Sequence, residues 1–178
     1  MNLSDQEILQ NIKAGEQKTF EALFRTYFQP LSLYAASIIH SQEDGEEIVQ
    51  DLFFQIWEKR QQLHITSSLK SYLYRSVRNR CLNFIKHQKV KEKYRQEAVQ
   101  QFSEAVNEPP SDAPELKEKI QAAITTLPAR CREVFELSRF EGLKYREIAE
   151  VLGISPKTVE VQMGKALKTL RKELKAYL

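Results

Sequence analysis

Lysine, threonine and glutamate side chains recur along the segment Ile154 to Arg171, which reads ISPKTVEVQMGKALKTLR. Lysines can donate hydrogen bonds to guanine or to phosphates, and a glutamate can accept one from a cytosine amine. An apolar residue returns every three or four positions, which predicts an amphipathic helix. Ser155 can cap its first free amides, and Pro156 suits the first helical position. The segment is therefore a candidate nucleic-acid-binding helix.

The residues before this helix predict how it is positioned. Counting from Tyr145, a small Ala149 is fifth, Gly153 is ninth and Val159 is fifteenth. This is the spacing of a helix-turn-helix, whose second helix enters the DNA major groove. A glycine alone would also fit any turn between helices, but the three residues together with the cap and the basic tail favour the motif.

The second helix has an inward and an outward face. Residues within about 60° of one another at the helical step of about 100° form the inward face. They are Val159, Met163, Ala166 and Leu170. The outward face supplies the candidate DNA contacts, which are Ser155, Lys157, Thr158, Glu160, Val161, Gly164, Lys165, Lys168 and Arg171. Those near the helix start can reach base edges, whereas Lys168 and Arg171 are expected to meet phosphates or to remain solvated. Glu160 has no lysine partner four positions on, because Gly164 stands there.

Charge is distributed unevenly along the 178 residues, although the net charge is only +3. The stretch from Ser41 to Glu58 has six acidic residues and no lysine or arginine. The stretch from Ile65 to Arg95 has nine basic residues and one glutamate. Either run alone could be a solvated helix face, but two adjacent runs of opposite sign suggest two different partners.

Helical periodicity covers most of the chain and strand signals are almost absent, so we predict an all-α fold. Three apolar stripes precede residue 88 and can bury one another as a helical domain of three or four helices, residues 1–88. A second, smaller helical domain is expected at residues 115–178. The polar segment between them, residues 89–114, contains NEPPSDAP and is predicted to be a flexible linker.

Several classes of function are disfavoured by the composition. Cys81 and Cys131 fit neither a metal knuckle nor a disulfide framework, and no apolar stretch approaches a membrane span, so we expect a reduced, cytoplasmic protein. The three histidines are scattered, no carboxylates have metal-ligand spacing and no glycine-rich phosphate loop is present. We therefore expect no metal, no cofactor, no small-molecule substrate and no catalytic residues.

Three segments together resemble a known family. LPARCREVFELSRFEGLKYREIAEVLGISPKTVEVQMGKALKTLR is similar to the promoter-binding C-terminal domain of bacterial sigma factors. DGEEIVQDLFFQIW and SYLYRSVRNRCLNFIK resemble the N-terminal domain of the same family. Because no third domain intervenes, the chain resembles a sigma factor of the extracytoplasmic-function (ECF) group.

The resemblance implies a transcription initiation factor that binds core RNA polymerase and recognises −35 duplex and −10 melted DNA. It assigns the outward face of the last helix to the −35 element. It assigns docking on a coiled coil of the polymerase β′ subunit to the acidic helix, with Asp44, Glu47, Gln50, Asp51 and Gln55 as the exposed candidates. It also implies an anti-sigma factor as a partner, membrane-linked in many members of the group.

The basic helix after the acidic one corresponds to the segment that holds the melted −10 element, and LHITSSLK corresponds to the loop that captures a flipped base. Unstacking duplex DNA costs about 1.4 kcal/mol per base step, so the protein must offer cations and stacking surfaces. The candidates for −10 contacts are His64, Ser67, Lys70, Arg75, Arg78, Asn79, Arg80, Asn83 and Lys86. Tyr72 and Tyr74 could stack on bases, although Tyr72 lies near the apolar stripe and is expected in the core.

The main alternative is a helix-turn-helix regulator that binds DNA without being a polymerase subunit. Such a protein would carry a ligand-binding or phosphorylatable N-terminal domain, usually with strands. The acidic helix followed by a basic, aromatic helix disfavours it.

The linker yields a testable prediction. NEPPSDAP is polar and lacks apolar anchors, so burial cannot offset the entropy lost on ordering it. We expect limited proteolysis to cut first between Glu104 and Glu115 and to leave two helical fragments. Resistance of this stretch, together with a single rigid shape in solution scattering, would show that the linker interpretation is wrong.

Overall fold

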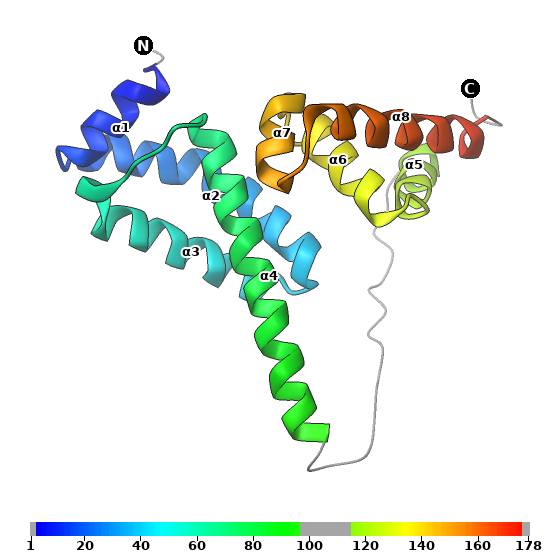
Figure 1. Cartoon of the computed structure of the whole chain (residues 1–178), viewed down its shortest axis with the longest axis horizontal. Coiled ribbons are helices and arrows are strands. Elements are labelled where there is room, and N and C mark those ends of the chain that lie inside the picture. Colours follow the sequence, from blue (N-terminus) through cyan, green and yellow to red (C-terminus); the bar gives the residue numbers. More distant parts are fainter. Residues whose placement is uncertain (1–2, 97–114, 176–178) are drawn as a thin grey trace. The chain divides into compact units, whose positions relative to one another are not determined.

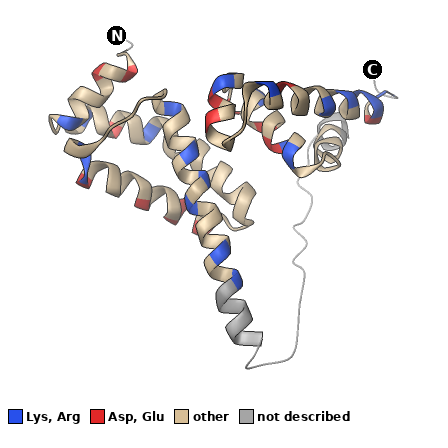
Figure 2. Ribbon diagram, in the orientation of Figure 1, with Lys and Arg blue, Asp and Glu red and all other residues tan. Residues whose placement is uncertain are grey.

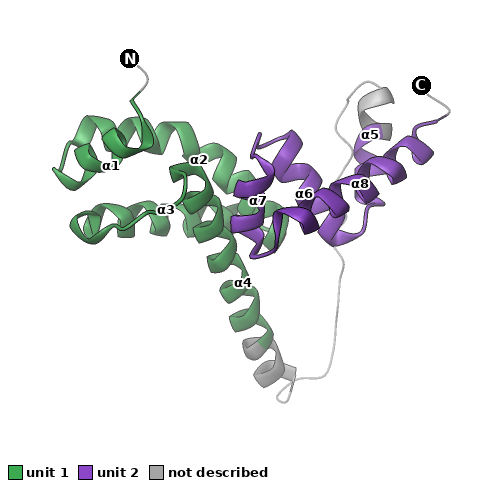
Figure 3. Cartoon of the chain, turned by 45° about the horizontal axis from the view of Figure 1, so that its top comes forward, with its two compact units in different colours: residues 1–98 green, residues 99–178 purple. Residues whose placement is uncertain are grey.

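The computed structural model describes residues 3–96 and 115–175, and these residues lie in helices, turns and loops, without a strand (Figure 1). The chain divides into two compact units, residues 1–98 and residues 99–178 (Figure 3). The predicted all-α fold of two helical domains is thus confirmed. Most of the predicted linker, including NEPPSDAP and the predicted protease sites, lies outside the described residues.

The first unit is built from four α-helices and one 3-10 turn within its described part. They are α1 (Asp5–Lys13), α2 (Gln17–Ile39), α3 (Gln42–Glu58), η1 (Arg60–Gln62) and α4 (Leu69–Gln96). Helix α2 packs against α3, and α4 packs against both of them. Helix α4 continues past residue 88, where we had placed the end of the first domain.

The three apolar stripes seen in the sequence form the core of this unit. The fully or almost fully buried residues include Leu23, Leu31, Val49, Leu52, Phe53, Ile56, Leu73, Val77 and Cys81. Aromatic rings fill the space between α2 and α3: the ring centroids of Phe24 and Phe53 lie 5.0 Å apart, and those of Phe20 and Trp57 lie 4.8 Å apart. Such contacts add to the burial of apolar area, so α2 and α3 form a firm base for α4.

A glycine allows α2 and α3 to approach closely. A β-carbon added at Gly45, in the first turns of α3, would lie 3.0 Å from the backbone nitrogen of Ala36 and 3.1 Å from the carbonyl oxygen of Ser32. Both atoms belong to the backbone of α2, which cannot move without shifting the helix. Gly45 therefore sets the distance between the two helices.

The second unit contains α5 (Glu115–Thr125), α6 (Ala129–Arg139), α7 (Tyr145–Leu152) and α8 (Pro156–Glu173). Helix α8 packs against α5, α6 and α7. Its predicted inward residues are buried, as expected: Val159, Met163, Ala166 and Leu170. Gly153 ends α7 with φ 65° in the left-handed region, where glycine is favoured, and so makes the tight turn into α8.

Two side chains tie α6 to its neighbours. The guanidinium of Arg132 donates to the carbonyl oxygens of Ile124 and Leu127, each at 3.2 Å, and also to that of Thr125. Ile124 and Thr125 are the last residues of α5, where carbonyls have no amide one turn further on in the helix, and Leu127 lies in the turn that follows. The carbonyl of Ile124 also accepts from the amide of Leu127 at 3.1 Å. The thiol of Cys131 donates to Oε1 of Gln162 in α8 at 3.0 Å. Helix α6 is thus bonded to both the end of α5 and the middle of α8.

The packing at Gly45 predicts the effect of one added methyl group. Gly45→Ala should lower the free energy of unfolding of the first unit by about 1 kcal/mol, because overpacking costs about 1–3 kcal/mol and the better helix propensity of alanine offsets part of that. Trp57 is the one tryptophan of the chain and lies in α3, so its fluorescence during chemical denaturation reports this unit.

The matched control is Gly164→Ala in α8, where an added β-carbon meets no atom within 4 Å. This variant should leave the Trp57 transition unchanged. An unchanged transition in Gly45→Ala would show that α2 can shift to accept the methyl group.

Candidate functional site

The outward face of α3 carries the predicted acidic surface. Glu47, Gln50, Asp51 and Gln55 are exposed, and Asp44 is half-buried beside the helix start, where its amide donates to Oγ of Ser41 at 3.3 Å. The opposite face holds the buried residues of the core. Figure 2 shows acidic residues along α3 and basic residues along α4. The two charged surfaces therefore belong to neighbouring helices of one unit.

The acidic surface contains an aromatic residue that the sequence pattern did not single out. Phe54 is 66% exposed, three positions after Asp51 and seven after Glu47. Phe54 was not among the exposed candidates that we named for this helix. The helical phase was the available signal, because positions three and seven residues apart share a helix face.

The outward face of α4 carries the predicted basic and amide residues. Arg75, Asn79, Asn83 and Lys86 are exposed along one stripe, whereas Arg78 and Arg80 are half-buried. Leu82, which is 43% exposed, also lies on this stripe and was not among the predicted contacts. The stripe thus combines cations and amides with one apolar side chain.

The loop between η1 and α4, residues 63–68, contains the other predicted −10 residues. His64 is exposed and Ser67 is half-buried. Lys70, at the start of α4, lies with Nζ 5.9 Å from the ring centroid of Tyr74. The loop and the stripe on α4 are consecutive in the chain, so the nine candidates lie on one loop and one helix.

The structure corrects the assignment of the two tyrosines. Tyr74 is only 1% exposed, and its ring centroid lies 5.2 Å from that of Tyr34 in α2. A ring enclosed in this way has no face for a nucleobase, so the stacking role suggested for Tyr74 is wrong. Tyr72, which we had expected in the core, is half-buried. The reason is the packing of α2 on α4, which the pattern of α4 alone does not reveal.

One hydrogen bond joins the two charged surfaces. Nη2 of Arg80 in α4 donates to Oε1 of Gln55 in α3 at 2.8 Å. One partner comes from the predicted polymerase surface and the other from the predicted −10 surface. A change in the position of either side chain therefore alters the bonding of the other.

Two groups, one in each unit, have pKa values that burial raises. Burial raises the pKa of the Cys81 thiol, beneath the stripe on α4, to about 11. The thiol is therefore protonated at neutral pH, and Cys81 acts as an apolar core residue. In the second unit, burial raises the pKa of Glu136 above its usual range, while the charge of Arg132 lowers it.

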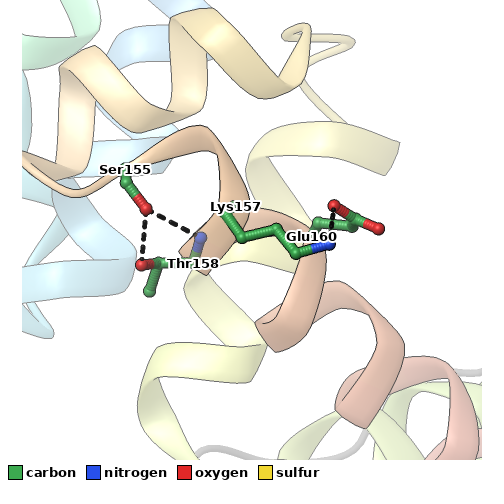
Figure 4. A network of polar contacts seen from close by, with 4 residues as sticks. All are labelled: Ser155, Lys157, Thr158 and Glu160. Carbon is green, nitrogen blue, oxygen red and sulfur yellow. Dashed lines mark hydrogen bonds and ion pairs between the residues drawn. The ribbon is translucent and has the colours of Figure 1, made fainter.

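The start of α8 has the predicted cap. Oγ of Ser155 accepts a hydrogen bond from the backbone amide of Thr158 at 3.0 Å, and the two hydroxyls lie 2.8 Å apart (Figure 4). Both hydroxyls are therefore engaged at the helix start, although both residues are exposed. Their first role is to fix where α8 begins.

The next two polar residues of α8 form a pair with each other. Nζ of Lys157 lies 2.9 Å from Oε2 of Glu160, and both side chains are mostly exposed. An exposed pair of this kind contributes little to stability, so either side chain can exchange its partner for DNA. The other outward candidates, Val161, Gly164, Lys165, Lys168 and Arg171, are exposed as well.

Among the described residues no helix is long and apolar enough to cross a membrane. No group of three or more histidine, cysteine, aspartate or glutamate residues is placed to hold a metal ion in that part of the chain.

Comparison with known protein families accounts for both units. The family description "Sigma-70 region 2" matches residues 23–90, and "Sigma-70, region 4" matches residues 117–170. The chain is 30% identical over 135 residues to RNA polymerase sigma factor SigZ of Bacillus subtilis, a match that covers 76% of this chain and 75% of the relative. The chain belongs to the ECF sigma factors. Sigma factors are non-catalytic transcription initiation factors, so this sigma factor binds core RNA polymerase and directs it to promoters.

Other relatives extend the match over almost all of this chain. ECF RNA polymerase sigma factor SigW of Bacillus subtilis is 25% identical over 185 residues, covering 98% of this chain and 99% of the relative. The fold is similar to CnrH, solved in complex with the cytosolic domain of CnrY, with a TM-score of 0.65, 24% identity and 97% of each chain covered. It is also similar to RpoE of Bartonella quintana, solved with the anti-sigma factor NepR, with a TM-score of 0.64, 23% identity and coverage of 89% of this chain and 98% of that one.

Proposed function

We propose that this sigma factor divides its work between its two units. Residues 1–88 bind core polymerase and recognise and melt the −10 element, residues 115–178 recognise the −35 element, and residues 89–114 connect them. The observation that carries this proposal is the placement of an acidic, aromatic surface on α3 and a basic surface on α4 of the same unit. One rigid body can then hold polymerase and DNA at the same time.

The docking surface consists of outward residues of α3, namely the half-buried Asp44 and the exposed Glu47, Gln50, Asp51 and Gln55, together with Phe54. Interfaces derive most of their affinity from a few large side chains that become fully buried, and charged residues around them steer association. Phe54 is the large apolar side chain on this face. In our proposal it inserts into the β′ coiled coil, and the surrounding carboxylates meet basic residues of that partner.

The −10 surface consists of the outward stripe of α4 and the loop of residues 63–68. Arg75 and Lys86 can follow the DNA backbone, while Asn79 and Asn83 can bond base edges. Leu82, between them, offers an apolar contact to an unstacked base or a sugar. Arg80 is held by Gln55, so in our proposal it couples polymerase docking to DNA contact more than it binds DNA by itself.

The −35 surface is the outward face of α8. Ser155 and Thr158 fix the helix start, and Lys157 and Glu160 stand at the end that enters the major groove. Lysine can donate to guanine, and glutamate can accept from cytosine. The pair is thus suited to G·C base pairs, with Lys165, Lys168 and Arg171 further along for bases or phosphates.

Regulation by an anti-sigma factor is a further part of the proposal. The two structural neighbours CnrH and RpoE were each solved with a bound partner, which for RpoE is an anti-sigma factor. Such a partner, membrane-linked in many ECF systems, would cover the exposed faces of α3 and α4.

The sigma factor acts in the cytoplasm, where core polymerase and chromosomal DNA are found, and needs no cofactor. A regulator that binds DNA without polymerase is not favoured, since such a protein needs no region 2 docking surface.

The docking proposal predicts the effect of substitutions on α3. Phe54→Ala, and Glu47→Lys combined with Asp51→Lys, should each weaken binding to the isolated β′ coiled coil at least about tenfold, because loss of a buried interface anchor costs about 1–2 kcal/mol or more. Substitutions at exposed positions change stability little. The free energy of unfolding, followed by Trp57 fluorescence, should therefore stay within about 0.5 kcal/mol of the parent's value. Titration calorimetry measures the affinity.

The matched control is Leu33→Ala, which removes an exposed apolar side chain from α2, 52% exposed, in the same unit. It should bind the coiled coil normally. If folded Phe54→Ala binds as tightly as the parent, the docking assignment for this face is wrong.

The −35 proposal predicts different roles for two lysines of α8. Lys157→Ala should change which −35 sequence is preferred, since a base contact is worth about 1–3 kcal/mol of discrimination. Lys168→Ala should weaken all sequences alike and lower the salt slope of binding by about one unit, as expected for a phosphate contact. Binding of holoenzyme to a panel of −35 sequences at several salt concentrations measures both effects. Identical behaviour of the two variants across the panel would refute this division.

A further inference from the structure

Helix α1 holds both ends of the loop between η1 and α4. At the far end, Oδ2 of Asp5 accepts a hydrogen bond from the backbone amide of Leu69, the first residue of α4, at 2.8 Å. At the near end, η1 packs against α1. Arg60 of η1 lies at the turn after α1, because a β-carbon added at Gly15 would stand 3.8 Å from its Nε. The loop of residues 63–68 therefore runs between two points that α1 contacts.

The carboxylate of Asp5 gives the Leu69 amide an acceptor from outside the loop. The first four amides of a helix have no partner within the helix. Oγ of Ser68 accepts from the amide of Ser71 at 3.2 Å, which satisfies one of them locally. The carboxylate of Asp5 satisfies another from 64 positions away in the sequence and places a negative charge at the positive end of α4. The start of α4 is thereby attached to a different helix.

Asp5 itself stands on a well-fixed helical turn. Ser4 and Glu7 form a reciprocal capping box: the amide of Ser4 donates to Oε2 of Glu7 at 2.7 Å, and the amide of Glu7 donates to Oγ of Ser4 at 3.3 Å. The backbone hydrogen bond from Ser4 lowers the pKa of Glu7 below its usual value. Further along the helix, Ile12 is completely buried. The start of α1 is thus fixed by its capping box and its end by the burial of Ile12.

We propose that Asp5 is a positioning residue, through which α1 presets the loop of residues 63–68 for capture of an unstacked promoter base. Holding both ends of a short loop reduces the number of conformations that it samples, so less entropy is lost when a base enters. The inference rests on the −10 role proposed for this loop. It extends that role to α1, which lies before the residues 23–90 matched by region 2.

The charge of Asp5 supports positioning over direct contact with DNA. A carboxylate beside the path of the DNA backbone repels phosphates, so it is a poor choice for a DNA ligand. As an acceptor for the Leu69 amide it needs no contact with DNA. The exposed residues of the loop, His64 and Thr66, remain available to the base.

The test measures base selectivity with holoenzyme assembled from core polymerase and the full chain. The probe is a promoter library randomised across the −10 element, from which unwound DNA is selected and sequenced. Asp5→Ala should reduce the ratio between the preferred and the disfavoured bases at the captured position by about tenfold, since small displacements of positioning groups have effects of this size or larger. Affinity for core polymerase should not change.

Two variants separate positioning from general stability. Asp5→Asn keeps a side-chain oxygen that can accept from Leu69, so it should restore most of the selectivity lost in Asp5→Ala. Ile12→Val removes one buried methyl group from the other end of α1 and leaves Asp5 and the capping box in place, so it should lower stability by about 0.5–1.5 kcal/mol with selectivity retained. Equal loss of selectivity in Ile12→Val and Asp5→Ala would overturn the role of the Asp5 contact.

A loop variant, His64→Ala combined with Ser67→Ala, distinguishes failure of this inference from failure of the −10 assignment. If the loop variant loses selectivity while Asp5→Ala retains it, the positioning role is wrong and the −10 role of the loop stands. If the loop variant itself keeps full selectivity, the −10 assignment of the loop is wrong and the role of Asp5 falls with it.

Discussion

The close packing of α2 on α3 is the constraint on which the first unit depends. Gly45 lets the two backbones approach, and the aromatic rings of Phe20, Phe24 and Phe53 fill the space that this approach leaves. Because this face of α3 is fully used in packing, the opposite face must point outward. The exposure of Phe54 among acidic residues is a direct consequence, and so is the surface that we assign to polymerase.

Helix α4 completes this arrangement and brings two surfaces of opposite charge together on one body. Its buried stripe packs on α2 and α3, which leaves its basic and amide residues outward. The hydrogen bond between Arg80 and Gln55 crosses from one surface to the other. Docking and DNA contact therefore share one packed core. A partner that moves Gln55 on the first surface also changes the hydrogen bond of Arg80 on the second.

In the second unit, α5, α6 and α7 pack against one side of α8 and leave its other side exposed. Gly153 makes the turn, Ser155 caps the start of α8, and the guanidinium of Arg132 binds carbonyls at and just after the end of α5. With its inward stripe buried, α8 presents Lys157, Glu160 and the residues beyond them on the outward face. The turn and the cap decide where that face begins.

Local pattern alone determined much of this protein. The cap at Ser155, the inward stripe of α8, the three stripes of the first unit and the all-α class follow from helical periodicity and from capping chemistry, which act over a few residues. The burial of Tyr74 and the bond from Asp5 to Leu69 were decided only by the tertiary structure. A side chain on the margin of an apolar stripe is buried or exposed according to which neighbouring helix covers it, and a contact across 64 positions leaves no periodic trace in either helix.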